Sequence, residues 1–395
     1  MKFKYKKIKD IAVVYSGTTP STSKSEYWNG NIKWITPAEL QDGHNWYIYD
    51  TERKITDEAV RSKNLKMLKK GTILLTTRAP IGKVALVGEV MCTNQGFKNI
   101  ECNTDVVNPE FLYFWLLSKK EYLNSLGRGA TFKEISKTIV ENIQVPVPPL
   151  GIQGKIVEIL KQSLFLIDKR KAQIESLDQL TQSVFLEMFG DIRINSKKFK
   201  QVKLNEVITK ITTGKSLAGE GISEYKVLKT SAVSYKFFKQ NEVKYLPQDY
   251  VPPVSHIVNK GDVLVSRMNT SELVGAAAYV FNEIKNVALP DRIWKLHYSR
   301  KINPIFLWYF INQSYFRDKV TDIATGTSGS MKNISQKKYL NLSILLPDIS
   351  LQNKFAEFVY KIQIEKDKMD KGLIELNNIF NSLMQRTFNG KLFPE

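Results

Sequence analysis

The sequence has little of what metal centres and disulfide frameworks need. Its 395 residues include two cysteines and three histidines, and the histidines lie far apart in the chain. We therefore expect neither a disulfide scaffold nor a structural metal. Long apolar runs are missing too, since none approaches the ~20 residues that span a bilayer, and the apolar stretch after the basic start is too short for a signal peptide. These absences predict a cytoplasmic protein with no membrane contact.

Acidic residues are scarce relative to basic ones, and the formal net charge is +19. Residues 1–150 carry +7 and residues 191–347 carry +12, whereas residues 151–190 and 348–395 are neutral. An excess of this kind favours a polyanionic partner such as nucleic acid over an ordinary lysine-rich protein. Because two basic blocks are separated by neutral segments, we expect two contact points on one long polyanion.

The chain contains an internal repeat with an offset of about 200 residues. VPVPPLGIQGKIVEIL, which begins at Val145, returns as ILLPDISLQNKFAEFV, which begins at Ile344. Four further pairs follow the same order: YSGTTP with TTGKSL, KKGTILLTTR with NKGDVLVSR, NPEFLYFWL with NPIFLWYFI, and GATFKEIS with SGSMKNIS. Each half is therefore predicted to be a complete structural unit.

The pattern within each half predicts an α/β (α+β) module followed by a long helix. Short β-branched runs bounded by Gly and Pro, namely GTILLTT, KVALVGEV, GDVLVSR and AAAYVF, are typical of strands. Apolar segments over 109–126 and 304–320 begin with proline and predict one amphipathic helix each, whose aromatic side chains we assign to the core rather than to base stacking. The predicted domains are residues 1–150, 151–190, 191–347 and 348–395.

Residues 152–188 and 351–388 are free of proline and follow a heptad pattern. The apolar positions predict a coiled-coil seam of Ile152, Ile156, Ile159, Leu177 and Leu180 in the first segment, and of Leu351, Phe355, Phe358, Leu376 and Ile379 in the second. Each helix would be ~55 Å long, which favours pairing of the two helices over the alternative that each folds back on its own module.

The twofold order of these motifs resembles the specificity subunit of type I restriction-modification systems, over the whole chain. The segment SGTTPSTSKSEYWNGNIKWITPAEL, the KKG-strand-Arg element and the Pro-Leu/Ile-x-x-Gln helix entry carry the resemblance. It implies two target recognition domains in pseudo-twofold tandem repeat, each reading one half of a bipartite, asymmetric DNA sequence. It also implies an antiparallel coiled coil that sets the gap between the halves.

The same resemblance implies a subunit with no chemistry and no cofactor of its own. Two methyltransferase subunits that use S-adenosylmethionine, and two restriction subunits that use ATP and Mg for translocation and cleavage, would assemble on it. The sequence agrees in lacking an Asn-Pro-Pro-aromatic motif and in lacking the context of a phosphate loop around GKS at Gly214. Two alternatives stay open: a self-contained methyltransferase or nuclease, and a bivalent scaffold for RNA or protein.

Candidate DNA-binding residues are those with directional donors on loops. In the first module these are Arg78, Lys83, Asn94, Gln95, Arg128, Thr131 and Lys133. In the second they are Arg267, Asn269, Thr270, Arg292, Thr327, Ser330, Lys332 and Asn333. Arginine can bond bidentately to guanine, and Asn or Gln to adenine. The alternative for each residue is a surface ion pair or an ordinary turn.

Overall fold

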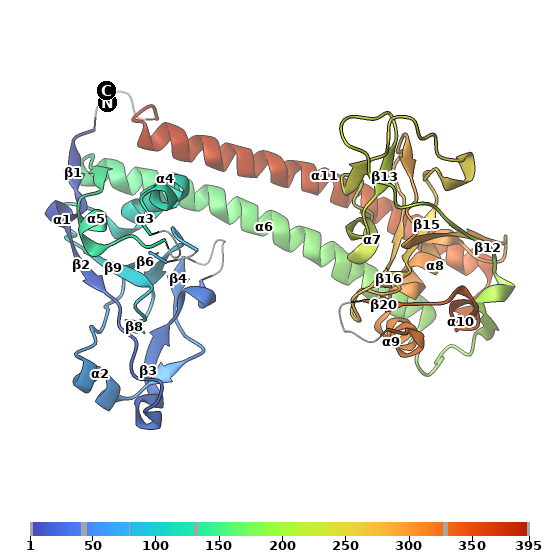
Figure 1. The fold of residues 1–395 in the computed structure, drawn as a ribbon, viewed down its shortest axis with the longest axis horizontal. Helices are drawn as coiled ribbons and strands as arrows, with labels where there is room; N and C mark the ends of the chain where they lie inside the picture. Colours follow the sequence, from blue (N-terminus) through green and yellow to red (C-terminus); the bar gives the residue numbers. More distant parts are fainter. Residues whose placement is uncertain (1–2, 41–45, 79, 130–132, 327–330, 393–395) are drawn as a thin grey trace. The chain divides into compact units, whose positions relative to one another are not determined.

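The chain forms two compact units, each of which includes parts of two 40-residue helices. The computed structural model describes residues 3–40, 46–78, 80–129, 133–326 and 331–392. Unit 1 consists of Met1–Ile174 and Met369–Glu395, and unit 2 is Glu175–Lys368. Helices α6 (Leu150–Phe189) and α11 (Ile349–Phe388) are unbroken ribbons in Figure 1. Because the division falls inside both helices, the predicted boundaries of the four domains stay a prediction.

Unit 1 is built on a five-stranded sheet in the order β2-β9-β6-β7-β4. Its strands are β2 (Ala12–Ser16), β4 (Tyr47–Ile48), β6 (Ile73–Thr76), β7 (Val84–Val87) and β9 (Phe97–Cys102). A second sheet, in the order β5-β3-β8, contains β3 (Trp28–Ile35), β5 (Lys54–Ile55) and β8 (Cys92–Thr93). Strands β1 (Tyr5–Lys7) and β10 (Gln144–Pro146) form a separate antiparallel pair.

Unit 2 is built on a four-stranded sheet in the order β12-β19-β15-β17. Its strands are β12 (Ile208–Thr213), β15 (Val263–Ser266), β17 (Ala277–Tyr279) and β19 (Ile293–Tyr298). A second sheet, in the order β14-β13-β18, contains β13 (Lys226–Leu228), β14 (Val243–Tyr245) and β18 (Val287–Ala288). Two antiparallel pairs complete the set: β11 (Lys200–Lys203) with β21 (Ser343–Leu346), and β16 (Met268–Asn269) with β20 (Lys332–Asn333).

The two units repeat the same topology, which confirms the predicted tandem repeat and the mixed α/β class. The order β2-β9-β6-β7 has its counterpart in β12-β19-β15-β17, and every neighbouring pair in both sets is antiparallel. The smaller sheets match as well, because each combines one antiparallel pair with one parallel pair. The four runs that predicted strands lie in β6, β7, β15 and β17.

Each of the two predicted proline-led helices is divided into two, which corrects the prediction of one helix over 109–126 and one over 304–320. The short helices are α1 (Ile8–Ile11), α2 (Asp57–Lys63), α3 (Pro109–Leu117), α4 (Lys120–Ser125), α5 (Lys137–Glu141), α7 (Ser231–Ser234), α8 (Pro304–Ile311), α9 (Ser314–Ile323) and α10 (Gln336–Leu340). Polar side chains end α3 and α8. The Ser118 hydroxyl donates to the Trp115 carbonyl, and the Asn312 amide donates to the carbonyls of Trp308 and Ala277. The bonds to Trp115 and Trp308 satisfy carbonyl groups in the last turns of the helices, and the bond to Ala277 ties the end of α8 to β17.

Helices α3 and α8 are buried and begin in the same way. The side-chain oxygen of Asn108 accepts hydrogen bonds from the amides of Glu110 and Phe111, and Asn303 makes the equivalent bonds at α8. Such caps favour Asn followed by Pro at the helix start. The aromatic residues of α3 and most of those of α8 are buried, as predicted for core residues.

A buried glutamine at the start of each long helix ties it to the neighbouring cap. Gln153 accepts from the Asn108 amide at 2.8 Å and donates to the carbonyls of Val106 and Pro148. Gln352 bonds in the same way to the Asn303 amide and to the carbonyls of Lys301 and Pro347. Both glutamines have no exposed surface. This clamp explains why the Pro-Leu/Ile-x-x-Gln motif appears twice.

The long helices pair in antiparallel fashion within each unit. In unit 1, Arg170 of α6 donates to the Met369 carbonyl of α11 at 3.4 Å. Phe388, at the end of α11, packs on Phe111 of α3 in the core that also contains Ile156 from the start of α6. In unit 2, Lys366 of α11 pairs with Asp178 of α6 at 2.5 Å, while Phe355 packs on the last turn of α6. Pairing of the helices is thus confirmed, and each helix also packs on the core of a module.

The buried face of the helices differs in part from the predicted seam. Ile152, Ile156 and Leu376 lie in or against the core of unit 1, and Leu351, Phe355 and Phe358 in or against that of unit 2. Ile159 and Leu177 are half-buried. Leu180 and Ile379 are 45% and 53% exposed, which corrects their assignment to the seam. The buried positions run one residue later, as at Thr181 and Phe380, because the helices pack on module cores as well as on each other.

Candidate nucleic-acid interface

In each module, three segments that are far apart in the sequence meet beyond the end of the central strand. In the first module the Thr77 amide donates to the Gly96 carbonyl at 2.8 Å, and the Ile135 amide donates to the Thr77 carbonyl at 2.9 Å. In the second module the corresponding bonds are Arg267 to Arg292 at 2.9 Å and Ile334 to Arg267 at 3.1 Å. The predicted DNA-binding loops of each module are therefore neighbours in the fold.

This hydrogen-bond pattern corrects one equivalence between the halves. Arg267 occupies the place of Thr77, so Met268 is the counterpart of Arg78. The sequence match joined Arg78 to Arg267 because both end the same apolar run. Successive side chains of a strand point to opposite faces, so a shift of one residue changes the face that each arginine presents.

A nearby turn depends on a glycine in both halves. The Gly17 amide donates to the Phe97 carbonyl and the Gly214 amide to the Pro290 carbonyl. A Cβ atom at Gly17 would lie 1.8 Å from the Asn94 carbonyl oxygen, and one at Gly214 would lie 1.7 Å from that of Leu289. Only glycine allows this approach, which places the loop around Asn94 against the end of β2 and the loop before Arg292 against the end of β12.

In the first module, the side chains of Arg78 and Lys98 contact one carboxylate, that of Glu134. Arg78 donates from Nε to Glu134 at 3.1 Å, and the Arg128 backbone pairs with that of Glu134. The ammonium of Lys98, whose side chain is only 7% exposed, lies 3.5 Å from the same carboxylate. Glu134 was missing from the sequence-based candidates, because a single glutamate in a basic loop has no distinguishing local signal.

The remaining candidates of the first module differ in accessibility. Lys83 is turned inward, donating to the Leu40 carbonyl at 2.5 Å, and the Asn94 side-chain oxygen accepts from the Gly96 amide within its own turn. Gln95, Arg128 and Lys133 are exposed. Thr131 lies outside the described residues. For all these positions, contact with DNA stays a prediction.

In the second module, Arg267 donates from Nε to the side-chain oxygen of Asn333 at 3.2 Å. Asn269 donates to the hydroxyls of Ser234 and Ser266, and its own oxygen accepts from the Thr270 amide. Lys332 donates to the Gly326 carbonyl at 3.0 Å. Thr327 and Ser330 lie outside the described residues. The structure thus brings Arg267 and Asn333 together and ties Asn269 into the scaffold.

Exposed Arg292 lines a basic pocket of about 300 Å³. Lys229, Lys244, Thr230 and Ser216 also contribute to its wall, and the Ser216 hydroxyl bonds to Asp291. Three cationic side chains around one pocket make it attractive to an anionic group.

A buried arginine supports the loop that follows Asn269. Arg317 of α9 donates from Nη2 to the Glu272 carbonyl at 2.9 Å, and the Thr321 hydroxyl donates to the Ser271 carbonyl at 3.4 Å. Burial lowers the pKa of the Arg317 guanidinium. Burial, together with the positive charge of Arg317, also lowers the pKa of Lys236. This part of unit 2 therefore holds a concentration of positive charge behind the predicted binding loops.

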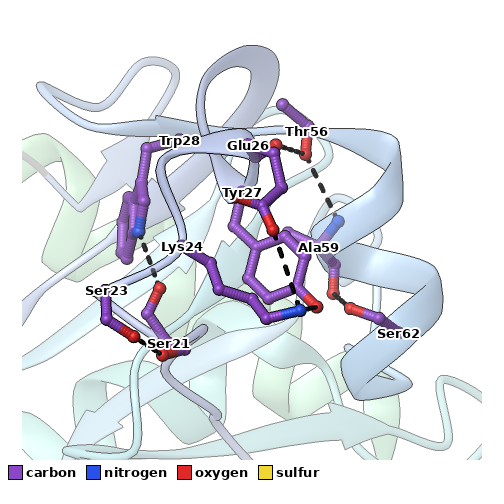
Figure 2. Close-up of polar contacts among 9 residues, drawn as sticks. All are labelled: Ser21, Ser23, Lys24, Glu26, Tyr27, Trp28, Thr56, Ala59 and Ser62. Carbon is purple, nitrogen blue, oxygen red and sulfur yellow. Dashed lines mark hydrogen bonds and ion pairs between the residues drawn. The ribbon is translucent and has the colours of Figure 1, made fainter.

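In the first module, polar contacts join residues 21–28 to residues 56–62 (Figure 2). The Thr56 hydroxyl donates to the Glu26 carbonyl at 2.8 Å and caps α2 by accepting from the Ala59 amide. The Trp28 indole donates to the Ser21 carbonyl at 3.1 Å. Lys24 donates to the hydroxyl of buried Tyr27 at 3.4 Å. These bonds order the serine-rich loop of the motif SGTTPSTSKSEYWNG.

No helix in the described part of the chain is both long enough and apolar enough to cross a membrane. No group of three or more His, Cys, Asp or Glu side chains is arranged there to hold a metal ion.

Residues 1–177 match the protein family described as "Type I restriction modification DNA specificity domain". The type I restriction enzyme MjaIX specificity subunit of Methanocaldococcus jannaschii is 43% identical over 188 residues, which are 47% of this chain and 43% of that relative. The MjaVIII specificity subunit of the same organism is 26% identical over 388 residues, which cover 93% of this chain and 88% of the relative. The chain thus spans under half the length of the first relative and most of the second.

The fold is similar to that of solved proteins over its whole length. The S subunit of a type I restriction-modification system from M. genitalium matches with a TM-score of 0.57 at 16% identity, covering 100% of this chain and 96% of that one. A chain from a structure on complex assembly and conformational transition of the type I R-M system matches with a TM-score of 0.59 at 17% identity, covering 99% and 98%. Residues 1–177 thus match a type I DNA specificity domain, and the chain as a whole shares the fold of solved type I specificity subunits.

Proposed function

We propose that this chain reads a bipartite, asymmetric sequence in double-stranded DNA, one half-site with each module. The observation that carries the proposal is the repeat of the loop cluster: the same three segments meet in each module, and each cluster presents an arginine bonded through Nε. Because the side chains of the two clusters differ, the two half-sites should differ in sequence. Phosphate contacts would come from the exposed lysines and arginines, since the excess charge lies in the two modules.

In this proposal the chain itself has no catalytic role. Two methyltransferase subunits using S-adenosylmethionine and two restriction subunits using ATP and Mg would assemble on it, so that cofactors are held by partners. The paired helices α6 and α11 would set the gap between the half-sites and offer the scaffold for assembly. Support for these points comes from the match of residues 1–177 to the family and from the long helix pair.

The adenine methylome of the source strain, compared with that of a deletion strain, tests the proposal. We expect the deletion to remove methylation at one bipartite motif with a fixed gap, and a plasmid copy of the gene to restore it. Purification of the tagged full chain should recover a methyltransferase subunit. If all motifs persist and no methyltransferase copurifies, the proposed function is wrong.

A further inference from the structure

The guanidinium groups of Arg78 and Arg267 are held in the same way, although the two residues are not equivalent in sequence. Glu134 and Asn333 are equivalent, because each immediately precedes the isoleucine whose amide bonds to the strand end. Arg78 lies directly opposite Glu134, whereas Arg267 lies one residue before Met268, which is the residue opposite Asn333. Arginines from two different strand positions thus reach the same loop position.

The contact that the two modules share is the Nε bond, at 3.1 Å to Glu134 and 3.2 Å to Asn333. An ion pair cannot explain both, because the asparagine is neutral. A guanidinium is a rigid plane with five N–H donors. Fixing Nε therefore sets the direction of the whole group and leaves the edge formed by Nη1 and Nη2 available. Neither arginine has a partner for that edge among the residues that the structure describes.

On this basis, and resting on the proposed function, we infer that Arg78 and Arg267 each read one guanine, and that Glu134 and Asn333 are the positioning residues that orient them. The two Nη atoms match the O6 and N7 acceptors of guanine in the major groove. Each half-site then contains one specific guanine, and Glu134, at the centre of the first cluster, positions the arginine that reads it. The Arg78 side chain is 48% exposed, so the free edge is accessible to a base.

The different partners also predict a difference between the modules. Glu134 accepts from Arg78 and balances buried Lys98, so its carboxylate is needed for the scaffold as well as for orientation. Among the residues that the structure describes, the neutral side chain of Asn333 bonds only to Arg267, because its bonds to Thr325 come from the backbone. Removal of the Asn333 side chain should therefore disturb base reading with little effect on folding, whereas removal of the Glu134 side chain should disturb both.

The test is selection of duplexes from a pool with a randomised central segment, using the full chain together with the methyltransferase subunits that copurify with it. We expect the native protein to select a bipartite motif. Arg78→Ala should reduce the preference for one guanine in one half-site by about 5- to 150-fold and leave the base preferences at the other motif positions unchanged. Arg267→Ala should do the same in the other half-site. Arg78→Lys should lose the guanine preference as well, because an ammonium lacks the planar fork.

The positioning role has its own readout. Glu134→Gln keeps an acceptor oxygen and should retain the guanine preference in the half-site read by Arg78. Asn333→Ala should weaken the guanine preference that depends on Arg267. Lys137→Ala, which removes the exposed cation of an ion pair in the first module, is the matched control and should leave the base preference at every motif position unchanged. Thermal unfolding of each variant separates misfolding from altered reading.

The outcomes are distinguishable. If Arg78→Ala and Arg267→Ala weaken binding to all duplexes equally and leave both profiles unchanged, the arginines contact phosphates and the inference is overturned, while the proposed function stands. If Asn333→Ala folds normally and keeps the guanine preference that depends on Arg267, Asn333 has no positioning role. If the native protein selects no motif at all, the proposed function itself fails.

Discussion

At the scale of single residues, the glutamines of the repeated helix entry are central to stability. Gln153 and Gln352 each make three hydrogen bonds to backbone groups, and neither has exposed surface. A buried backbone group that loses its partner retains the cost of its desolvation. The clamp connects the first turn of a 40-residue helix to the cap of a core helix, so its loss should be felt throughout a unit.

We predict that Gln153→Ala lowers the free energy of unfolding by about 2–4 kcal/mol, because it leaves one buried amide and two carbonyls without their partner. Urea unfolding followed by circular dichroism measures the change. Gln162→Ala, at an exposed position of the same helix, is the control and should change the free energy by no more than about 0.5 kcal/mol. Equal effects of the two substitutions would show that the clamp is unimportant.

At the scale of elements, the pairing of α6 and α11 combines apolar ends with polar contacts near the middle. In unit 2, Lys366 has a side chain that is 9% exposed, with its ammonium 2.5 Å from Asp178 and above the ring of Phe237. In unit 1, Gly372 faces Arg170, since an added Cβ would lie 2.3 Å from its Nη1 atom. A buried cation that fits only one carboxylate favours one alignment of the helices over shifted ones.

Removing the carboxylate that faces Lys366 should destabilise unit 2. We predict that Asp178→Ala costs about 1–3 kcal/mol, less than for a fully buried pair because the Asp178 side chain is 49% exposed. Adding Lys366→Met should recover most of the loss, because no buried charge is then left unpaired. Glu357→Ala breaks an exposed ion pair on α11, the helix of Lys366, and is the control, with an expected effect below about 1 kcal/mol. Failure of the double variant to recover would contradict this account of the pair.

At the scale of the whole molecule, unit 1 is made from two separate segments of the chain and unit 2 from the continuous segment between them. Unit 1 takes the first part of α6 and the last part of α11, and unit 2 takes the remainder of both helices. Phe380, Met384 and Phe388 belong to the core of unit 1, although they come more than 200 residues after Ile167, the last of its other buried residues. We expect the two units to unfold together, because the loss of either helix removes core residues from both.

The two thiols provide the test, because both lie in unit 1. Burial raises the pKa of Cys92 to about 11 and that of Cys102 to about 12. A raised thiol pKa means less thiolate, so at pH 8 only about one thiol in 10³ or fewer is ionised. We predict that a disulfide reagent does not modify the native protein at pH 8, and that modification begins at the urea concentration that unfolds unit 1.

A destabilised unit 2 should shift that concentration. Gln352→Ala, which acts in unit 2, is expected to lower the urea midpoint of thiol exposure in unit 1 by the same amount as the midpoint seen by circular dichroism. A thiol midpoint that does not move would mean that the two units unfold independently.

Much of this protein is determined by its sequence alone. The repeat, the α/β class, the long helices and the separation of charge follow from residue spacing and composition, which local geometry converts directly into helices and strands. The tertiary structure decided the rest. The guanidinium of Arg78 meets Glu134 across 56 residues, and Thr77 and Arg267 are equivalent because of backbone bonds that no local pattern records. The exposure of Leu180 and Ile379 was likewise set by packing, because each helix contacts a module as well as its partner helix. Contacts of this kind depend on where distant segments come together, and that is a property of the fold rather than of any short stretch of sequence.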